Sequence, residues 1–409
     1  MKTGKVPQQL LLFACGIALL MLNACSKEHG ETTTYKILSP VYEDRSTALA
    51  ALNGRADQSF LHTGKIYVKD NFIFINEIDK GIHVIDNTNP SHPRQIAFLR
   101  IPGNEDIAIL GNILYADMYA DLLAIDITDV TKVHLTASLN NFFTGRQFVN
   151  GYQTTGDQVI TDWIEKDTTA PLNPPGNCLA CQLMLASAAA GPVGQAGSMA
   201  KMVLLNNYLY AISEAHSLGI ASVTNAKSPH FEGSMFAGYD LETIYPFEDK
   251  LFLGSDVGTF MYDVSNPVQP LSIGTFEHGR ACDPVVTDGS YAYVTLHAGT
   301  NCGGDENELD VVDVRNIEQS VLVKAYPMTK PTGLCQDGKL LFVCDSTVVK
   351  IFDTTDPSAL QLLNQISCNS PYDVIARNKI AMVVNNEGLF QFDYTDLNNI
   401  RQLSFLSEK

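Results

Sequence analysis

Basic residues are scarce in this sequence, and that scarcity limits the partners it can bind. The chain holds 27 lysine and arginine residues against 45 aspartate and glutamate residues, a formal net charge of −18 at pH 7. A surface this acidic repels nucleic acid and anionic lipid headgroups. We therefore expect no nucleic-acid partner.

Long apolar runs are also scarce. The longest, Leu10–Leu22, makes about 20 Å of helix at ~1.5 Å per residue, which is too short for the ~30 Å hydrocarbon core of a bilayer. Lys2 and Lys5 precede the run, and a short apolar run after a basic segment is typical of a secretory signal peptide. No later run approaches membrane-spanning length.

The apolar run ends in Leu22-Asn23-Ala24-Cys25, which resembles the lipobox of bacterial lipoproteins. The resemblance implies cleavage before Cys25 and lipid on its thiol. It predicts a signal peptide over 1–24, a lipidated tether and N-terminal packing segment over 25–60, and an exported, membrane-anchored protein at the outer membrane or cell surface. The alternative is an ordinary secretory signal in which the cysteine is incidental.

Export would place the remaining cysteines where disulfides persist. Without Cys15, in the signal peptide, and Cys25, seven cysteines are left, so at least one stays free or pairs between chains. These seven are Cys178, Cys181, Cys282, Cys302, Cys335, Cys344 and Cys368.

A repeat of about 40 residues organises the rest of the chain. Each copy holds four short segments rich in Val, Ile, Tyr and Phe, divided by turn residues, and in six of the seven copies the third segment closes on an Asp. Four strands per 40 residues is typical of a propeller blade, so we predict an all-β, seven-bladed β-propeller over 61–409. The closing positions are Asp86, Asp126, Thr224, Asp263, Asp313, Asp353 and Asp393.

The spacing between Asp126 and Thr224 is 98 residues, which favours an insertion at about 143–197. Its composition, with Pro171, Pro174 and Pro175, is typical of a loop. Because 98 is close to twice the repeat length, an eighth, decayed blade is the alternative.

The closing strands read I-H-V-I-D, L-L-A-I-D, L-D-V-V-D and V-K-I-F-D, and they resemble the LVIVD-repeat family of exported bacterial β-propeller lipoproteins. The resemblance covers roughly residues 64–409. It implies the propeller and the export, and it implies no activity. Trp163 is the single tryptophan, so propeller repeats that close on Trp-Asp are excluded.

The repeated aspartates are predicted to be structural. Each begins a turn, of the type D-x-[ST]-[ND]-P at Asp86, Asp263 and Asp353, in which the carboxylate accepts a hydrogen bond from the backbone N–H two residues on. A residue present in six of seven repeats is expected to have a structural role common to the blades. Binding residues should therefore lie where the blades differ.

Two long departures from the repeat fall on one face of the propeller, where the loops between second and third strands meet the blade-to-blade connections. They are the insertion and the loop 297–308. Binding residues concentrate on such loops. The candidate ligand face comprises Trp163, His278, Arg280, Asp283 and His297. Trp163 is either a stacking platform or the small core of the insertion.

Disulfides Cys282–Cys302 and Cys178–Cys181 are the favoured interpretation of the cysteines on this face. A zinc site that includes His278 and His297 is the less favoured one. We expect no metal and no cofactor.

Three functions remain open. The favoured one is a non-catalytic binding propeller, anchored to the membrane, whose ligand is a protein, a peptide or a glycan. The second is a structural platform subunit of a cell-envelope assembly. The third is a polymer-degrading propeller hydrolase or lyase, for which the sequence offers no catalytic motif.

Overall fold

The computed structural model describes residues 32–54, 58–171, 198, 200–279, 284–298, 306–385 and 387–407. The chain forms two compact units. The larger comprises residues 40–163 and 189–409, and the smaller comprises residues 1–39 and 164–188.

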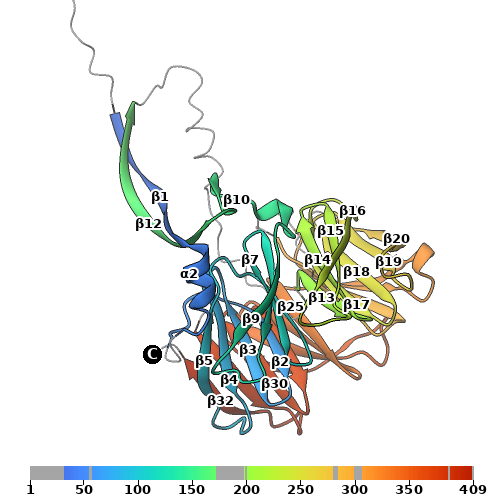
Figure 1. The fold of residues 1–409 in the computed structure, drawn as a ribbon. Coiled ribbons are helices and arrows are strands. Elements are labelled where there is room, and N and C mark those ends of the chain that lie inside the picture. Colours follow the sequence, from blue (N-terminus) through green and yellow to red (C-terminus); the bar gives the residue numbers. More distant parts are fainter. Residues whose placement is uncertain are drawn as a thin grey trace, which may run out of the picture. The chain divides into compact units, whose positions relative to one another are not determined.

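The larger unit contains seven four-stranded antiparallel sheets, each built from consecutive strands (Figure 1). The predicted seven-bladed propeller is therefore confirmed, and the eighth blade is absent from the described chain. The first three blades are β2(Thr63–Lys69), β3(Phe72–Glu77), β4(Gly81–Asp86) and β5(Arg94–Arg100); β6(Ile107–Leu110), β7(Ile113–Met118), β8(Asp121–Asp126) and β9(His134–Leu139); and β13(Met202–Leu205), β14(Tyr208–Glu214), β15(Ser217–Ser222) and β16(His230–Phe236).

The remaining four blades have the same order. They are β17(Leu241–Phe247), β18(Lys250–Ser255), β19(Gly258–Asp263) and β20(Leu271–Glu277); β21(Val285–Thr287), β22(Tyr291–Leu296), β23(Glu308–Asp313) and β24(Val321–Pro327); β25(Pro331–Asp337), β26(Leu340–Asp345), β27(Val348–Asp353) and β28(Gln361–Ser367); and β29(Asp373–Arg377), β30(Ile380–Asn385), β31(Gly388–Asp393) and β32(Arg401–Ser407). A short 3-10 turn, η4(Ile317–Gln319), precedes β24.

Each blade packs its two middle strands against a neighbouring blade. Leu122 and Ala124 of β8, for example, share a buried cluster with Leu209 and Ala211 of β14. A single four-stranded sheet buries too little apolar area alone, so the stack of blades supplies the core.

A register shift recurs between the third and fourth strands of all seven blades. In the first blade it lies between Val84 and Ile85. Such bulges increase the local twist of a sheet, which helps neighbouring blades to pack face to face. Gly81, Gly258 and Gly388 begin the third strand of their blades with φ of +145°, +155° and +135°. A Cβ at Gly81 would lie 1.9 Å from the carbonyl oxygen of Leu99, so this start of a strand requires glycine.

The six repeated aspartates all begin turns in the way the repeat suggested. The Oδ1 atom of each accepts a hydrogen bond from the N–H two residues on, as at Asp353, where the distance to Thr355 N is 2.8 Å. In the third blade the Thr224 hydroxyl instead lies 3.1 Å from that of Ser222. The carboxylates of the six aspartates therefore stabilise the turns between the third and fourth strands of their blades.

A short helix, α2(Arg45–Ala50), follows the N-terminal strand and lies within the predicted N-terminal packing segment 25–60. Ala48, together with Leu52 just beyond the helix, is buried in the core of the first two blades. No helix among the described residues has the length and apolar character needed to span a membrane.

The predicted insertion begins with regular structure. It contains a 3-10 turn, η2(Thr144–Arg146), a short strand pair, β10(Phe148–Val149) and β11(Tyr152–Gln153), and the long strand β12(Gln158–Pro171). β12 pairs with β1(Thr32–Asp44). In the smaller unit, this ribbon carries an ion pair of 2.6 Å between Lys36 and Glu165.

Candidate functional site: the axial cavity

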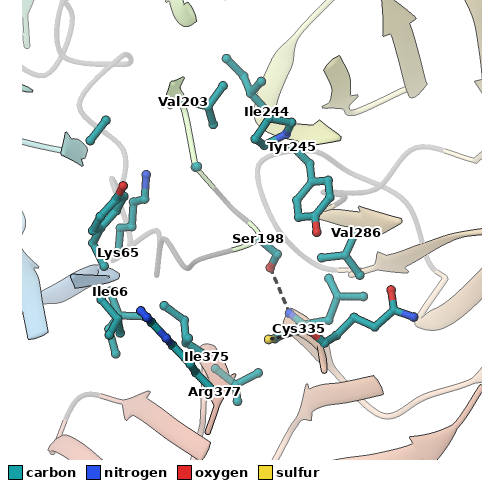
Figure 2. Close-up of a pocket in the computed structure, with 18 of the residues that line it drawn as sticks. Lys65, Ile66, Ser198, Val203, Ile244, Tyr245, Val286, Cys335, Ile375 and Arg377 are labelled. Atoms are coloured by element: carbon teal, nitrogen blue, oxygen red, sulfur yellow. Dashed lines mark hydrogen bonds between the residues drawn. The ribbon is translucent and has the colours of Figure 1, made fainter. Parts of the chain in front are cut away.

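The first strands of all seven blades surround a cavity of about 440 Å³ at the centre of the propeller (Figure 2). Most of its surface is aliphatic and comes from residues such as Ile66, Val203, Ile244, Val286 and Ile375. This volume lies within the usual range of small-molecule sites, ~300–1,000 Å³, and such sites are mostly apolar with few polar groups.

The cavity opens toward the ends of these first strands. Residues at the start of β2, such as Thr63 and Lys65, are 3% and 4% exposed, whereas Tyr67 and Val68 are half-buried. The same change from buried to half-buried residues occurs along β13, β17 and β25. The mouth therefore lies at the turns between first and second strands, on the face opposite the long loops.

Ser198 and Ala200 close the inner end. Ser198, 2% exposed, accepts a hydrogen bond of 3.0 Å from the N–H of Leu334 on β25, which Figure 2 shows. Ala200 accepts one of 2.6 Å from the N–H of Ile244 on β17. Together they place the residues that follow the predicted insertion at the floor of the cavity.

A buried ion pair ties this floor to the first two blades. The ammonium of Lys65 lies 2.8 Å from Asp106 Oδ1 and donates to the carbonyls of Ile107 and Met202 at 2.8 and 3.2 Å. Asp106 Oδ2 accepts hydrogen bonds from the N–H groups of Lys201 and Met202 at 2.6 and 2.7 Å. Since an ammonium has three protons, Lys65 has no donor left for a ligand.

Other polar groups of the lining are also engaged. The Tyr67 hydroxyl donates to the carbonyl of Ile109 at 3.2 Å, and the Gln336 amide donates to that of Gly338 at 3.2 Å. The Cys335 sulfur accepts from the N–H of Ala376 at 3.2 Å, and burial raises the pKa of this thiol to about 12, so it stays protonated. These groups shape the cavity and offer little to a ligand.

Two groups of the lining form no hydrogen bond or ion pair with another described residue, the hydroxyl of Tyr245 and the guanidinium of Arg377. Burial raises the pKa of Tyr245 to about 12, so its hydroxyl is a donor at neutral pH. Arg377 ends β29 at the mouth and is exposed. Figure 2 shows the two residues on different sides of the cavity.

The residues of the predicted ligand face are only partly gathered at an accessible surface. His297 is 8% exposed, its Nδ1 lies 3.1 Å from the carbonyl oxygen of Pro331, and burial lowers its pKa. Trp163 packs against the core of the first two blades and against Tyr152, with 5.8 Å between the two ring centroids. His278 is half-buried, with Nδ1 2.6 Å from the carbonyl oxygen of Gly279.

Several predictions fall outside the described residues. They are the lipidation at Cys25, the ligand-face residues Arg280 and Asp283, and the pairs Cys282–Cys302 and Cys178–Cys181. Cys335, Cys344 and Cys368 are described, and none of the three forms a disulfide. Within the described residues, no group of three or more His, Cys, Asp or Glu side chains is placed to hold a metal ion.

Two clusters of charge that the sequence did not indicate lie on the face of the long loops. In the first, Glu105 lies 3.1 Å from Arg146 and 3.1 Å from Lys201, residues near opposite ends of the insertion. Burial alone would raise the pKa of Glu105, but the two cations outweigh it and lower the pKa to about 2. Arg146 also pairs with Asp117 and Asp79, and burial raises the pKa of both carboxyls.

The second cluster lies in the fifth blade. Asp310 is 2% exposed, and its Oδ1 has no hydrogen-bond partner. Burial, reinforced by the nearby Glu308 carboxylate, raises the pKa of Asp310 to about 7. Both residues belong to β23 and project from the same side of it.

Sequence comparison locates one known repeat in the chain. The LVIVD repeat family matches residues 62–97 and 104–141, which are the first and second blades. These two blades are therefore similar to LVIVD repeats. No curated protein matches the sequence significantly.

Solved structures support the fold. The computationally designed Ika8 protein is 9% identical with a TM-score of 0.54, and the match covers 85% of this chain and 89% of that one. The periplasmic gluconolactonase PpgL of Pseudomonas aeruginosa is 11% identical with a TM-score of 0.55, covering 80% and 93%. BamB of Moraxella catarrhalis is 10% identical with a TM-score of 0.50, covering 87% and 99%. At such identities the likeness shows the propeller fold alone.

Proposed function

We propose that this protein is an exported, lipid-anchored propeller that binds an apolar ligand, or an apolar part of a larger one, in its axial cavity without transforming it. The observation that carries the proposal is the cavity of about 440 Å³, lined mostly by aliphatic side chains of the seven inner strands. Its mouth faces away from the long loops. The binding face proposed from the cavity is therefore not the one that the loops suggested.

The chemistry of the lining supports binding over catalysis. The described lining residues supply neither a carboxylate nor an imidazole, and the lysine and the cysteine among them are engaged by neighbours. Propeller hydrolases and lyases that use acid–base chemistry need such groups in reach of the substrate. The hydrolase and lyase alternatives thus gain no support from the cavity.

The platform function has one observation in its favour. Large apolar residues are exposed on the outermost strands of three consecutive blades, with Leu271 67%, Val321 60% and Leu362 51% exposed. An envelope assembly could cover such edges. This function would be preferred if the cavity binds nothing and the protein is recovered in a stable complex.

A neutral apolar dye tests the cavity. N-phenylnaphthylamine should fluoresce on binding the purified protein, and replacement of Ile375 or Val68 by Trp should reduce binding at least about tenfold because an indole fills the space. Leu362→Trp, on an exposed outer strand, is the matched control and should bind normally. Equal binding by all variants, each folded by circular dichroism, would place the dye elsewhere and refute the site.

The anchor has a separate test. Cys25→Ala should move the protein from the membrane fraction to the soluble fraction, because two or more acyl chains are needed for stable anchoring. Cys15→Ala, within the same apolar run, is the control and should stay in the membrane fraction. Retention of the Cys25 variant in the membrane would contradict lipid anchoring at this residue.

A further inference from the structure

The charge of the cavity narrows the class of ligand, given that the proposed binding function holds. The chain as a whole is acidic, with a formal net charge of −18, yet the described lining contains two cations and no carboxylate. An electrostatic potential that favours anions in the cavity must therefore come from the two cations of its lining, since the net charge of the chain disfavours anions.

Of the two cations, only Arg377 can serve a ligand. Lys65 is at the floor, is neutralised by Asp106 and has all three protons in use. Arg377 is at the mouth, at the last position of β29, and it forms no hydrogen bond or ion pair with another described residue. Asp70 attracts it only at longer range, and that carboxylate is held by Lys69.

The positions of these groups define a ligand with two parts. An aliphatic body would fill the space between Ile66, Val203 and Ile375, while an anionic end would remain at the mouth beside Arg377 (Figure 2). A guanidinium presents paired N–H donors that match the two oxygens of a carboxylate. A ligand without an anionic group would leave the N–H donors of Arg377 hydrogen-bonded to water.

We propose that the axial cavity binds a small aliphatic carboxylic acid in its ionised form, with the carboxylate on Arg377 and the hydrocarbon chain directed toward Ser198. The cavity has an end as well as a mouth, because Ser198 and Ala200 close it. Affinity should therefore rise with chain length until the chain reaches the floor and then stop rising.

Matched pairs of acid and alcohol test the inference by calorimetry on the purified protein. Octanoate should bind about tenfold more tightly than octanol, since a hydrogen bond between charged groups adds to the same apolar burial. From hexanoate to octanoate, each methylene should add about fourfold. Dodecanoate should gain less than that per methylene, because the floor limits the chain.

Variants separate the charge from the cavity. Arg377→Gln should bind octanoate and octanol equally, whereas Arg401→Gln should keep the preference. Arg401 is the control because it is an exposed arginine of the same blade, paired with Asp393 at 2.6 Å. Ile375→Trp should weaken both ligands.

The outcomes distinguish the two proposals. If octanol binds in the cavity and octanoate binds no better, the carboxylate inference fails while the binding function stands. A preference for octanoate that survives in Arg377→Gln would also overturn the inference. If neither ligand nor the neutral dye binds wild-type protein, the binding function itself fails.

Discussion

Glu105 is a single carboxylate that contacts cations near both ends of the insertion. Arg146 lies at its start and Lys201 follows its end, each 3.1 Å from a different carboxylate oxygen. Lys201 is also next to Met202, whose N–H and carbonyl are bound by Asp106 and Lys65 at the cavity floor. One side chain thereby fixes the insertion where it leaves and rejoins the propeller.

The low pKa of Glu105 predicts a stability that depends on pH. Its pKa is about 2 in the folded protein and about 4.5 when free, so the ionised form favours the folded state. The contribution is fully present above about pH 4.5 and is lost as the pH falls toward 2. We expect Glu105→Gln to lower the free energy of unfolding by on the order of 2 kcal/mol at neutral pH.

Urea unfolding at several pH values measures this difference. It should shrink steadily between about pH 4.5 and 2, where wild-type Glu105 becomes protonated. Lys201→Gln removes one of the two cations and should raise the pKa of Glu105 in the folded protein, so in that background the loss should be complete at a higher pH. If the difference in unfolding free energy between wild type and Glu105→Gln stays constant with pH, the charge of Glu105 does not contribute to stability.

Among elements, β2, β6 and β13 are joined by the buried pair of Lys65 and Asp106, each with about 5% of its side chain exposed. Breaking a buried pair leaves one uncompensated charge, which costs about 3–5 kcal/mol. Lys65→Met should therefore lower the free energy of unfolding by about that amount. Asp106→Asn should cost less, because its amide oxygen still accepts backbone hydrogen bonds.

The double variant Lys65→Met/Asp106→Asn shows whether the two charges act on each other. Its loss in chemical denaturation should be smaller than the sum of the single losses by about 1–3 kcal/mol. Strictly additive losses would mean that Lys65 stabilises the floor through its two carbonyl contacts alone. Because both residues lie at the floor, dye binding should weaken along with stability.

These elements also show what the sequence could and could not predict. The seven blades were predictable because each repeats the same local order of strands and turns, down to the carboxylate of Asp353 on its turn. The pairing of β12 with β1 was not, because the partner strands are far apart in the chain. Nor was the role of Lys65, which the sequence shows only as one polar residue in T-G-K-I-Y-V-K.

The direction in which the cavity opens was hidden for the same reason. The long loops predicted a binding site on one face of the propeller, whereas the cavity opens on the other. The reason is that Ser198 and Ala200 form hydrogen bonds with β25 and β17 and so close the cavity at the loop side. A single sequence carries no signal for such contacts. Arg377, a basic residue at the end of an apolar first strand, gave no distinct signal, because the first strand of the first blade also ends on a basic residue, Lys69.

At the scale of the whole molecule, the ring must close between its last blade and its first. In the described chain every blade is made of consecutive strands, so no shared sheet joins β29–β32 to β2–β5. Side-chain hydrogen bonds join the two blades instead. Gln391, fully buried, exchanges two hydrogen bonds with Asn87, at 2.9 and 2.7 Å, and the Tyr372 hydroxyl donates to the carbonyl of Thr63 at 2.6 Å.

Gln391→Leu should therefore open the ring at this seam. The leucine leaves Asn87 and the carbonyl of Pro90 without their partner, and a buried unsatisfied group costs about 1–3 kcal/mol. Amide hydrogen exchange should rise first in the first and last blades, because local opening there requires only the free energy needed to separate these two blades. Exchange that rises equally in the fourth blade would show that the propeller opens as one cooperative unit and that the seam is no weaker than the other blade contacts.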